Sequence, residues 1–277
     1  MLLKIMLAMT AFAANSLLCR LALKGAHIDA IAFGSIRVAS GAAALWLLLQ
    51  LLPGSKKPAY SWRNAALLSV YVFAFSLAYV SLNTATGALL LFGAVQLVMT
   101  GWGLISGEKL TAWKTLGILG ALGGIGLLLL PGVERPPVFA SLMMMLAGAA
   151  WGLYSIAGKR VADAAASVTG NFILSVPIAV IAALAGRHGL HVDATGVMLG
   201  VISGAITSGA AYLLWYALLP SLHSTTASTL QLSVPCLAAL GGVVFIGEPL
   251  TLRVVVSTVI ILAGIGLVIW SDKTRQR

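Results

Sequence analysis

The chain has 277 residues, of which 60% are hydrophobic and only 9% are charged, and its formal net charge is +10. Its mean hydropathy of +1.03 lies far outside the range of a soluble globular domain, so the composition predicts an integral membrane protein. In a soluble protein this positive charge would suggest nucleic acid. In a membrane protein it bears instead on how lysine and arginine are divided between alternate loops, and we expect no nucleic-acid partner.

Charged residues cluster at intervals, and the apolar runs between them approach the ~20 residues that a helix needs to cross a bilayer. Ten such runs occupy residues 3–23, 30–52, 64–82, 84–105, 112–130, 137–158, 166–186, 194–217, 222–246 and 252–270. The connections are too short for an extramembrane domain. We therefore predict an all-α integral membrane fold of ten transmembrane helices that is surrounded by the lipid bilayer. The functional site is expected inside the helix bundle.

The first run has features of a signal peptide, but its apolar character continues through Leu17, Leu18 and Leu21, past any plausible cleavage point. We therefore expect a retained first helix. Cys19 and Cys236 both fall in predicted helices, where a buried apolar role is the ordinary interpretation. Neither a disulfide, a metal site nor a cofactor is predicted.

The distribution of positive charge predicts the orientation. Eleven lysines and arginines fall on the amino-terminal side of the predicted helices and four on the opposite side. Cytoplasmic loops carry the excess of these residues, so both termini are expected in the cytoplasm, across a bacterial inner membrane.

A five-residue motif occurs twice, as GEKLT at 107–111 and as GEPLT at 247–251. Residues 107–130 and 247–270 are identical at nine of 24 aligned positions, and 7–20 aligns with 146–159. The chain is therefore predicted to be duplicated, with one five-helix repeat at 1–131 and another at 137–272. Because five is odd, the second repeat must enter the membrane inverted. Inverted repeats are frequent in secondary transporters, whose substrate site lies near the midplane.

Each copy of the motif is interpreted as a tight turn between helices. The glycine ends one helix in a left-handed conformation, and the threonine caps the next helix. Glu108 and Glu248 would lie where a helix amino terminus favours a carboxylate. A role in carrying protons is the less favoured alternative, because both residues lie at a membrane interface.

Polar and aromatic residues are costly in mid-membrane unless they face a cavity or another helix. Phe12, Asn15 and Ser16 share one face of the first helix, and Trp151, Tyr154 and Ser155 occupy the aligned positions of the sixth. For Ser16 and Ser155, packing between helices is an equal alternative. From this pattern and the polar or aromatic residues of the third, fourth and ninth helices we select the substrate-binding candidates, which are Asn15, Tyr79, Gln96, Trp151, Tyr154 and Gln231.

Pro235 lies one turn after Gln231 in the ninth helix. Proline has no amide hydrogen and clashes with the carbonyl four residues earlier, so it should free the backbone acceptor of Gln231 and act as a hinge. We expect Asn15 and Gln96 to bind a carboxylate, and the Gln231 carbonyl with the face of Trp151 to bind an ammonium.

The ten helices, the two Gly-Glu-x-Leu-Thr turns and the glycine-rich GIGL segments resemble the EamA-type branch of the drug/metabolite transporter superfamily. Trp151-Gly152 and Pro235 match the family's pattern, whereas Phe12-Ala13 and Val95 depart from it. The stretch at 89–104 is most similar to bacterial aromatic amino acid exporters. The resemblance implies a central cavity lined by helices one, three, four, six, eight and nine.

All seven acidic residues fall in loops or at helix ends, which disfavours a cation exchanger that uses an embedded glutamate. Arg37 is the one basic residue well inside a predicted span, and we expect it to snorkel or to bind a carbonyl. A nearly neutral cavity suits a small zwitterion, so the sequence predicts a transporter that exports aromatic or other neutral amino acids, or similar metabolites.

Alternatives are a multidrug or other metabolite transporter of the same superfamily, a channel, and an integral-membrane enzyme built on His188, His191 and Asp193. A solvated loop is the favoured interpretation of that last cluster. The exact substrate, the direction of transport, the coupling ion and the oligomeric state, including whether the protein is a monomer, stay open.

Overall fold

The computed structural model describes residues 1–51, 57–129, 136–186, 191–247 and 252–275. Within these ranges every predicted span is helical. Eight spans are single helices: α1 (Leu2–Lys24), α2 (Ala30–Leu51), α3 (Trp62–Tyr79), α4 (Thr84–Ile105), α5 (Ala112–Leu129), α6 (Val138–Gly158), α7 (Ala164–Ala185) and α12 (Leu252–Arg275). Their ends agree with the predicted limits within a few residues, with α3 ending at Tyr79 and α12 continuing to Arg275.

The remaining two spans are helices with local changes of winding. The eighth span consists of α8 (Ala194–Ile202), the π-helix η2 (Ser203–Ala210), α9 (Ala211–Leu218) and the 3₁₀ turn η3 (Leu219–Ser221). The ninth consists of α10 (Ser224–Gln231), α11 (Ser233–Gly241) and the π-helix η4 (Gly242–Ile246). The prediction of an all-α protein with ten spans is confirmed. Seven of the described helices, taking 194–221 and 224–246 as one each, are long and apolar enough to cross a membrane.

Equivalent helices of the two halves pack against each other in opposite directions. Along α5 and α12, Gly117 faces Gly264, while Gly124, further along α5, faces Ser257, which lies earlier in α12. A Cβ atom on Gly117 would lie 2.7 Å from the Gly264 carbonyl oxygen, so this antiparallel contact requires a small residue. The α2–α7 pair runs antiparallel too, with Ser35 at Ala179 and Gly41 at Phe172. The bundle therefore has inverted halves.

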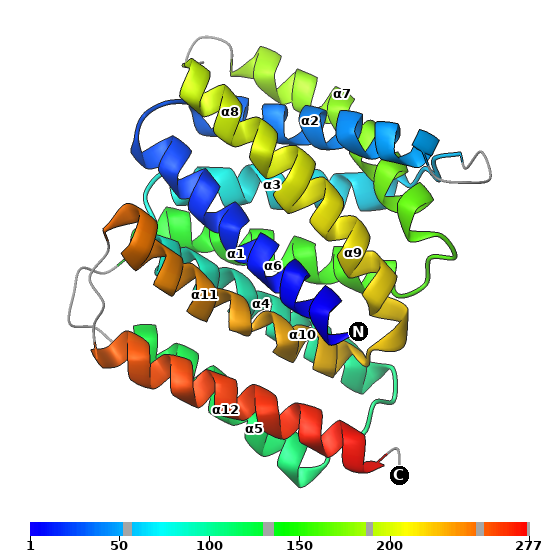
Figure 1. Cartoon of the computed structure of the whole chain (residues 1–277), viewed down its shortest axis with the longest axis vertical. Coiled ribbons are helices and arrows are strands. Elements are labelled where there is room, and N and C mark those ends of the chain that lie inside the picture. Colours follow the sequence, from blue (N-terminus) through cyan, green and yellow to red (C-terminus); the bar gives the residue numbers. More distant parts are fainter. Residues whose placement is uncertain (52–56, 130–135, 187–190, 248–251, 276–277) are drawn as a thin grey trace.

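Figure 1 shows how these pairs build the bundle. The α5–α12 pair forms one edge and α2 with α7 forms the other, while α1, α3, α4, α6 and the segmented eighth and ninth spans fill the middle. The first helix of each half packs on the third helix of the other: α1 contacts α8, η2 and α9, and α6 contacts α3. Both termini lie at the same end, as an even number of spans requires.

The repeated turns have the predicted backbone. Gly107 and Gly247 adopt left-handed conformations with φ of +85° and +73°, which glycine reaches without a steric penalty. The Thr111 hydroxyl accepts a hydrogen bond from the Lys114 amide at 3.1 Å, so it caps α5 as expected. Glu248 and Thr251 lie outside the described residues, as does most of the predicted boundary between the repeats, which stays a prediction.

The ninth span is interrupted at the position where Pro235 was expected to break the helix. The helix α10 ends at Gln231 and α11 begins at Ser233, and between them the Leu232 amide donates to the Thr229 carbonyl at 3.1 Å, three residues back. Because Pro235 cannot donate to the carbonyl of Gln231, the regular pattern of helical hydrogen bonds stops here.

Candidate functional site

Trp151 lies at the centre of a buried cluster to which both halves contribute. Its indole N–H donates to Oε1 of Gln231 at 2.7 Å, which joins α6 to α10. Only 2% of the Trp151 side chain is exposed. Four rings surround the indole, with centroid distances of 4.5 Å to Tyr212, 5.1 Å to Tyr71, 5.4 Å to Phe12 and 5.7 Å to Tyr154. The cluster therefore draws on α1, α3, α6, α9 and α10, in agreement with the spans expected to line the centre.

Two glutamines provide amide groups beside this cluster. Gln231 Nε2 donates to the Ala227 carbonyl at 3.3 Å and lies 3.5 Å from the Met99 sulfur. Gln96 Nε2 donates to the Thr100 hydroxyl at 2.9 Å and lies 3.5 Å from the Thr229 hydroxyl. The Oε1 atom of Gln96 is buried and has no hydrogen-bond partner in the described part of the chain. Gln96 thus has an unused acceptor, which suits an ammonium better than the carboxylate expected from the sequence.

Asn15 and Tyr154 hold neighbouring helices together. Asn15 Oδ1 accepts hydrogen bonds from the hydroxyls of Ser203 at 2.7 Å and Thr207 at 3.2 Å, both in η2. The Tyr154 hydroxyl accepts from Asn171 Nδ2 at 3.3 Å. Tyr154 also contacts Trp151, whereas the contacts of Asn15 favour the interhelical role.

Tyr79 lies apart from the other candidates. Its hydroxyl donates to the Thr84 carbonyl at 3.3 Å, and its ring packs 4.7 Å from that of Phe75, at the turn between α3 and α4. Tyr71, two turns earlier on the same face of α3, makes the contact with Trp151 instead. The structure therefore brings Trp151, Tyr154 and Gln231 into direct contact, with Gln96 beside them, and separates Tyr79 from them.

The expectation for Arg37 was wrong, because its guanidinium neither snorkels to the membrane surface nor binds a carbonyl. The side chain is fully buried, with Nε donating to Ser208 at 2.8 Å and Nη2 donating to the hydroxyls of Tyr212 at 2.6 Å and Tyr71 at 3.0 Å. The guanidinium also lies 5.1 Å from the Tyr71 ring centroid. Gly204 lets η2 approach this part of α2, since a Cβ atom there would collide with the Arg37 carbonyl.

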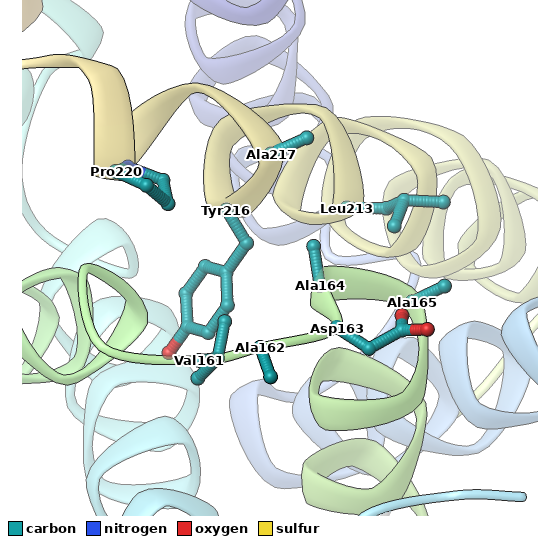
Figure 2. Close-up of a pocket in the computed structure, with 9 residues that line it drawn as sticks. All are labelled: Val161, Ala162, Asp163, Ala164, Ala165, Leu213, Tyr216, Ala217 and Pro220. Carbon is teal, nitrogen blue, oxygen red and sulfur yellow. The ribbon is translucent and has the colours of Figure 1, made fainter.

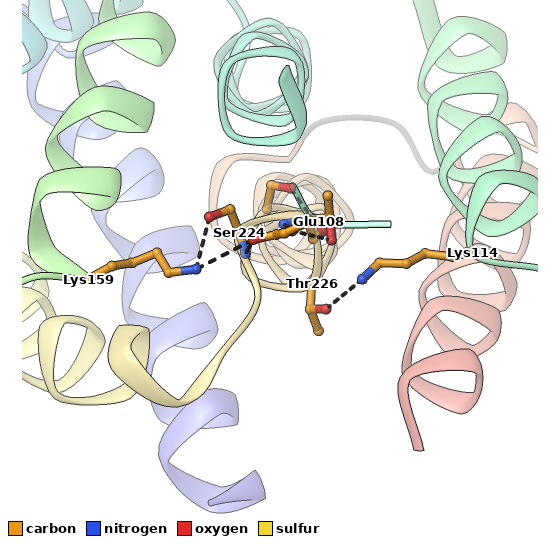
Figure 3. A network of polar contacts seen from close by, with 7 residues as sticks. Glu108, Lys114, Lys159, Ser224 and Thr226 are labelled. Atoms are coloured by element: carbon orange, nitrogen blue, oxygen red, sulfur yellow. Dashed lines mark hydrogen bonds and ion pairs between the residues drawn. The ribbon is translucent and has the colours of Figure 1, made fainter. Parts of the chain in front are cut away.

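Glu108 connects the two halves at the end of the bundle that carries the termini (Figure 3). Its Oε1 accepts from the Ser224 amide at 2.6 Å, and its Oε2 accepts from the Thr225 amide at 3.1 Å and the Thr225 hydroxyl at 2.9 Å. The carboxylate therefore caps α10. The prediction placed it at a helix amino terminus, but the helix belongs to the other half of the chain.

Lys159 approaches the same carboxylate from the end of α6. Its Nζ lies 3.6 Å from Glu108 Oε1 and donates to the Ser224 hydroxyl at 2.9 Å. Burial raises the pKa of Glu108, but the hydrogen bonds from Ser224 and Thr225 and the charge of Lys159 outweigh it and lower that pKa. Burial also lowers the pKa of Lys159, which Glu108 only partly offsets. The carboxylate is therefore held mainly by its shorter hydrogen bonds to α10, and the ion pair at 3.6 Å contributes less.

A surface pocket of ≈ 390 Å³ lies beside this network (Figure 2). It is lined by residues 161–163 of the α6–α7 connection, by the first two residues of α7, and by residues of α9 and η3. Figure 2 shows the Tyr216 ring reaching from α9 toward Val161. The Tyr216 hydroxyl donates to the Tyr154 carbonyl at 2.8 Å, and the two rings lie 4.8 Å apart. Tyr216 and Tyr154 thus separate this pocket from Trp151.

The polar residues described at the opposite end cap a helix or pair with one another. Asp193 caps α8 by accepting from the Gly196 amide at 2.7 Å, and its other oxygen lies 2.7 Å from Nδ1 of His27. Hydrogen bonds from the Gly196 amide and from His27 lower the pKa of Asp193. Asp29 accepts from the His191 amide at 3.0 Å. His188 lies outside the described residues, among which no group of three metal-ligating side chains occurs.

Sequence reasoning did not select Arg37, Tyr71 or Tyr212. One signal could have identified the two tyrosines, because the third helix of each half carries aromatic residues at the same spacing, at 71 and 75 and again at 212 and 216. Arg37 gave a different signal, as the one basic residue well inside a predicted span, but this did not identify its partners. Only the fold shows that η2 and α3 supply hydroxyl groups to it.

Comparisons with known proteins agree with this architecture. Residues 138–270 match the EamA-like transporter family. An uncharacterized protein of Pseudomonas aeruginosa is 47% identical over 264 residues, covering 95% of this chain and 92% of its own length. An uncharacterized transporter of Archaeoglobus fulgidus is 23% identical, with 94% of each chain covered. One crystal structure shares the fold with a TM-score of 0.76, at 18% identity over 96% of this chain and 97% of its own. The chain therefore belongs to the EamA-like transporter family of the drug/metabolite transporter superfamily, and is a multi-pass membrane protein.

Proposed function

We propose that this protein exports amino acids, aromatic or otherwise neutral, or similar small metabolites across the bacterial inner membrane by alternating access. The observation that carries the proposal is the cluster around Trp151. It is buried, it is built from both inverted halves, and it combines aromatic faces with amide groups. A site at the junction of inverted repeats is the place where relative motion of the halves changes access from one side to the other.

Substrate recognition is assigned to the cluster as follows. Trp151 covers an apolar or aromatic side chain and presents its face to an ammonium, a contact worth about 0.5 to 2 kcal/mol. Gln96 Oε1 and the backbone carbonyl of Gln231 accept hydrogen bonds from that ammonium. Tyr154 forms the wall toward the surface pocket of Figure 2. Asn15 keeps α1 attached to η2 and shapes the other wall.

Gating is assigned to Pro235 and to the contact between Glu108 and α10. The break after Gln231 lets α10 and α11 change their relative direction without loss of a regular helical hydrogen bond, because Pro235 cannot form one. Glu108 closes the end of the bundle where the termini lie, which we place in the cytoplasm from the excess of lysine and arginine there. In this proposal the Glu108 contact belongs to a state that is closed toward the cytoplasm.

The test is a counterflow screen in liposomes. Purified protein is reconstituted into vesicles loaded with one unlabelled amino acid at a time, and the uptake of its labelled form is measured. We expect saturable counterflow for at least one neutral or aromatic amino acid, and its loss in Trp151→Ala. Flux that never saturates would indicate a channel. Counterflow of cationic drugs alone would assign the protein to multidrug export instead.

A further inference from the structure

Arg37 is a fully buried cation whose charge no described carboxylate balances. It is the eighth residue of the 22-residue helix α2, well inside the apolar span. Its hydrogen-bond partners are the hydroxyl groups of Ser208, Tyr71 and Tyr212. Four carboxylates whose side chains the structure describes lie at helix ends and accept hydrogen bonds from backbone amides there: Asp29, Glu108, Asp163 and Asp193.

One edge of the guanidinium is unused. Nε and Nη2 donate to hydroxyls, whereas Nη1 is buried with no hydrogen-bond partner among the described residues. A buried charge costs much more free energy than it returns unless its donors are paired. A buried, unpaired Nη1 is therefore the feature expected of a site whose anion is supplied by a ligand.

The neighbouring tyrosines extend the donor set. Tyr212 accepts from Arg37 Nη2 and donates its own hydrogen to the Tyr71 hydroxyl at 3.0 Å. The Tyr71 oxygen thus accepts two hydrogen bonds, from Arg37 and from Tyr212. Its own hydrogen is left to donate to a further acceptor. Arg37 therefore orients and polarises the Tyr71 hydroxyl, and the two residues together offer donors but no acceptor.

We propose that Arg37 Nη1 and the Tyr71 hydroxyl form a subsite for the carboxylate of the transported substrate. The subsite adjoins the cluster described above, because the rings of Tyr71 and Tyr212 both contact Trp151. A carboxylate would complete the planar donor edge of the guanidinium with a charge-assisted hydrogen bond. This proposal rests on the proposed function and refines it: the substrate class is an organic acid or a zwitterion with an apolar side chain, and amines without a carboxylate are excluded.

Matched ligand pairs test the subsite without relying on transport. The full-length protein is purified in detergent, and the shift of its melting temperature is titrated with phenylalanine against phenylalaninamide and with phenylacetate against phenylacetamide. We expect each acid to bind at least about tenfold more tightly than its amide, because only the carboxylate carries the charge that Arg37 recognises. This comparison uses the wild-type protein, so it needs no variant to fold.

Variants then locate the preference. Arg37→Gln and Tyr71→Phe should bring the acid and the amide to similar affinities, with Arg37→Lys intermediate because lysine keeps the charge without the planar edge. Tyr216→Phe is the matched control, since it removes a buried tyrosine hydroxyl that donates to a backbone carbonyl and not to the Arg37 group. It should keep the preference for the acid.

Three results would overturn the carboxylate subsite. They are equal or absent shifts for the acid and the amide, a preference for the acid that persists in both Arg37→Gln and Tyr71→Phe, and stabilisation by chloride that acids neither add to nor displace. If the counterflow screen failed while acids still bound more tightly than amides, the proposed transport of amino acids would be wrong and the carboxylate subsite would stand. Transport of amines without acid binding would remove the subsite and leave a transporter.

Discussion

Replacing Glu108 by glutamine should open the end of the bundle where the termini lie. The carboxylate caps α10 with three hydrogen bonds of 2.6 to 3.1 Å, and Lys159 lies 3.6 Å away. Loss of a helix cap costs about 0.5 to 2 kcal/mol, and loss of the favourable charge at a helix amino terminus costs about 0.3 to 1 kcal/mol. Glutamine keeps one acceptor oxygen, so we expect the substitution to destabilise the closed form by roughly 1 to 3 kcal/mol. This corresponds to about a 5- to 150-fold change in the ratio of open to closed forms.

Cysteine labelling measures this shift. Ser228 is fully buried in α10, one turn beyond the Glu108 contact. In a background without Cys19 and Cys236, Ser228→Cys should react with a water-soluble maleimide slowly, and about 5- to 150-fold faster when Glu108→Gln is added. Asp163→Asn is the control, because Asp163 accepts from the Ala166 amide of its own helix α7.

The pH dependence of the same contact has a definite sign. The pKa of Glu108 is lowered in the closed form from its ordinary value of 4.5, so the carboxylate stabilises closure fully above that value. This stabilisation is lost as the pH falls through the lowered pKa. Maleimide reacts with the thiolate, so the labelling rate at each pH is divided by that of an unfolded reference thiol. This normalised rate of the parent protein should be constant around neutral pH and rise only in acid, while Glu108→Gln should show no such rise. Equal labelling rates in the two proteins at neutral pH would refute the gating role of Glu108.

Three other changes test separate parts of the proposal. Trp151→Ala should weaken substrate binding by roughly 10- to 100-fold, since it removes an aromatic face and leaves the Gln231 acceptor unpaired, whereas Trp151→Phe should be milder. The control is Trp270→Ala, at a half-exposed ring that packs against Trp113, and it should bind substrate as the parent does. Unchanged binding in Trp151→Ala would place the site elsewhere. Pro235→Ala should slow transport more than it lowers the melting temperature, and an unchanged rate would reduce the proline to a tolerated kink. A cysteine at Lys109, in the turn after α4, should be labelled only from the cytoplasm, and labelling from outside would refute the proposed orientation.

The helices and turns could be predicted because their causes are local. A run of about 20 apolar residues in a bilayer must satisfy its backbone internally, so its helical state follows from composition alone. The left-handed backbone at Gly107 and the cap at Thr111 follow likewise from residue type and spacing. Inversion followed from an odd number of helices in a repeated unit, which is a matter of counting.

Partners across the bundle could not be predicted in the same way. The i, i+4 spacing of Tyr71, Phe75 and Tyr79 places all three on one face of α3, yet only the depth at which α6 crosses that face decides which ring meets Trp151. Glu108 shows the same limit. Its preference for a helix amino terminus was evident, but the sequence does not say that the terminus of α10 lies within reach.

Arg37 shows why the substrate class depends on the fold. In sequence, a single arginine in an apolar run is most simply explained by snorkelling, since its long side chain can reach the interface. In the structure, η2 and α3 place Ser208, Tyr71 and Tyr212 around the guanidinium, so the charge is held inside with one edge unpaired. A neutral cavity would accept amines and zwitterions alike, whereas a held cation adjoining the Trp151 cluster repels an amine that lacks a carboxylate. Under the proposed carboxylate subsite, the choice between these substrates follows from where one side chain points, which hydropathy and spacing do not record.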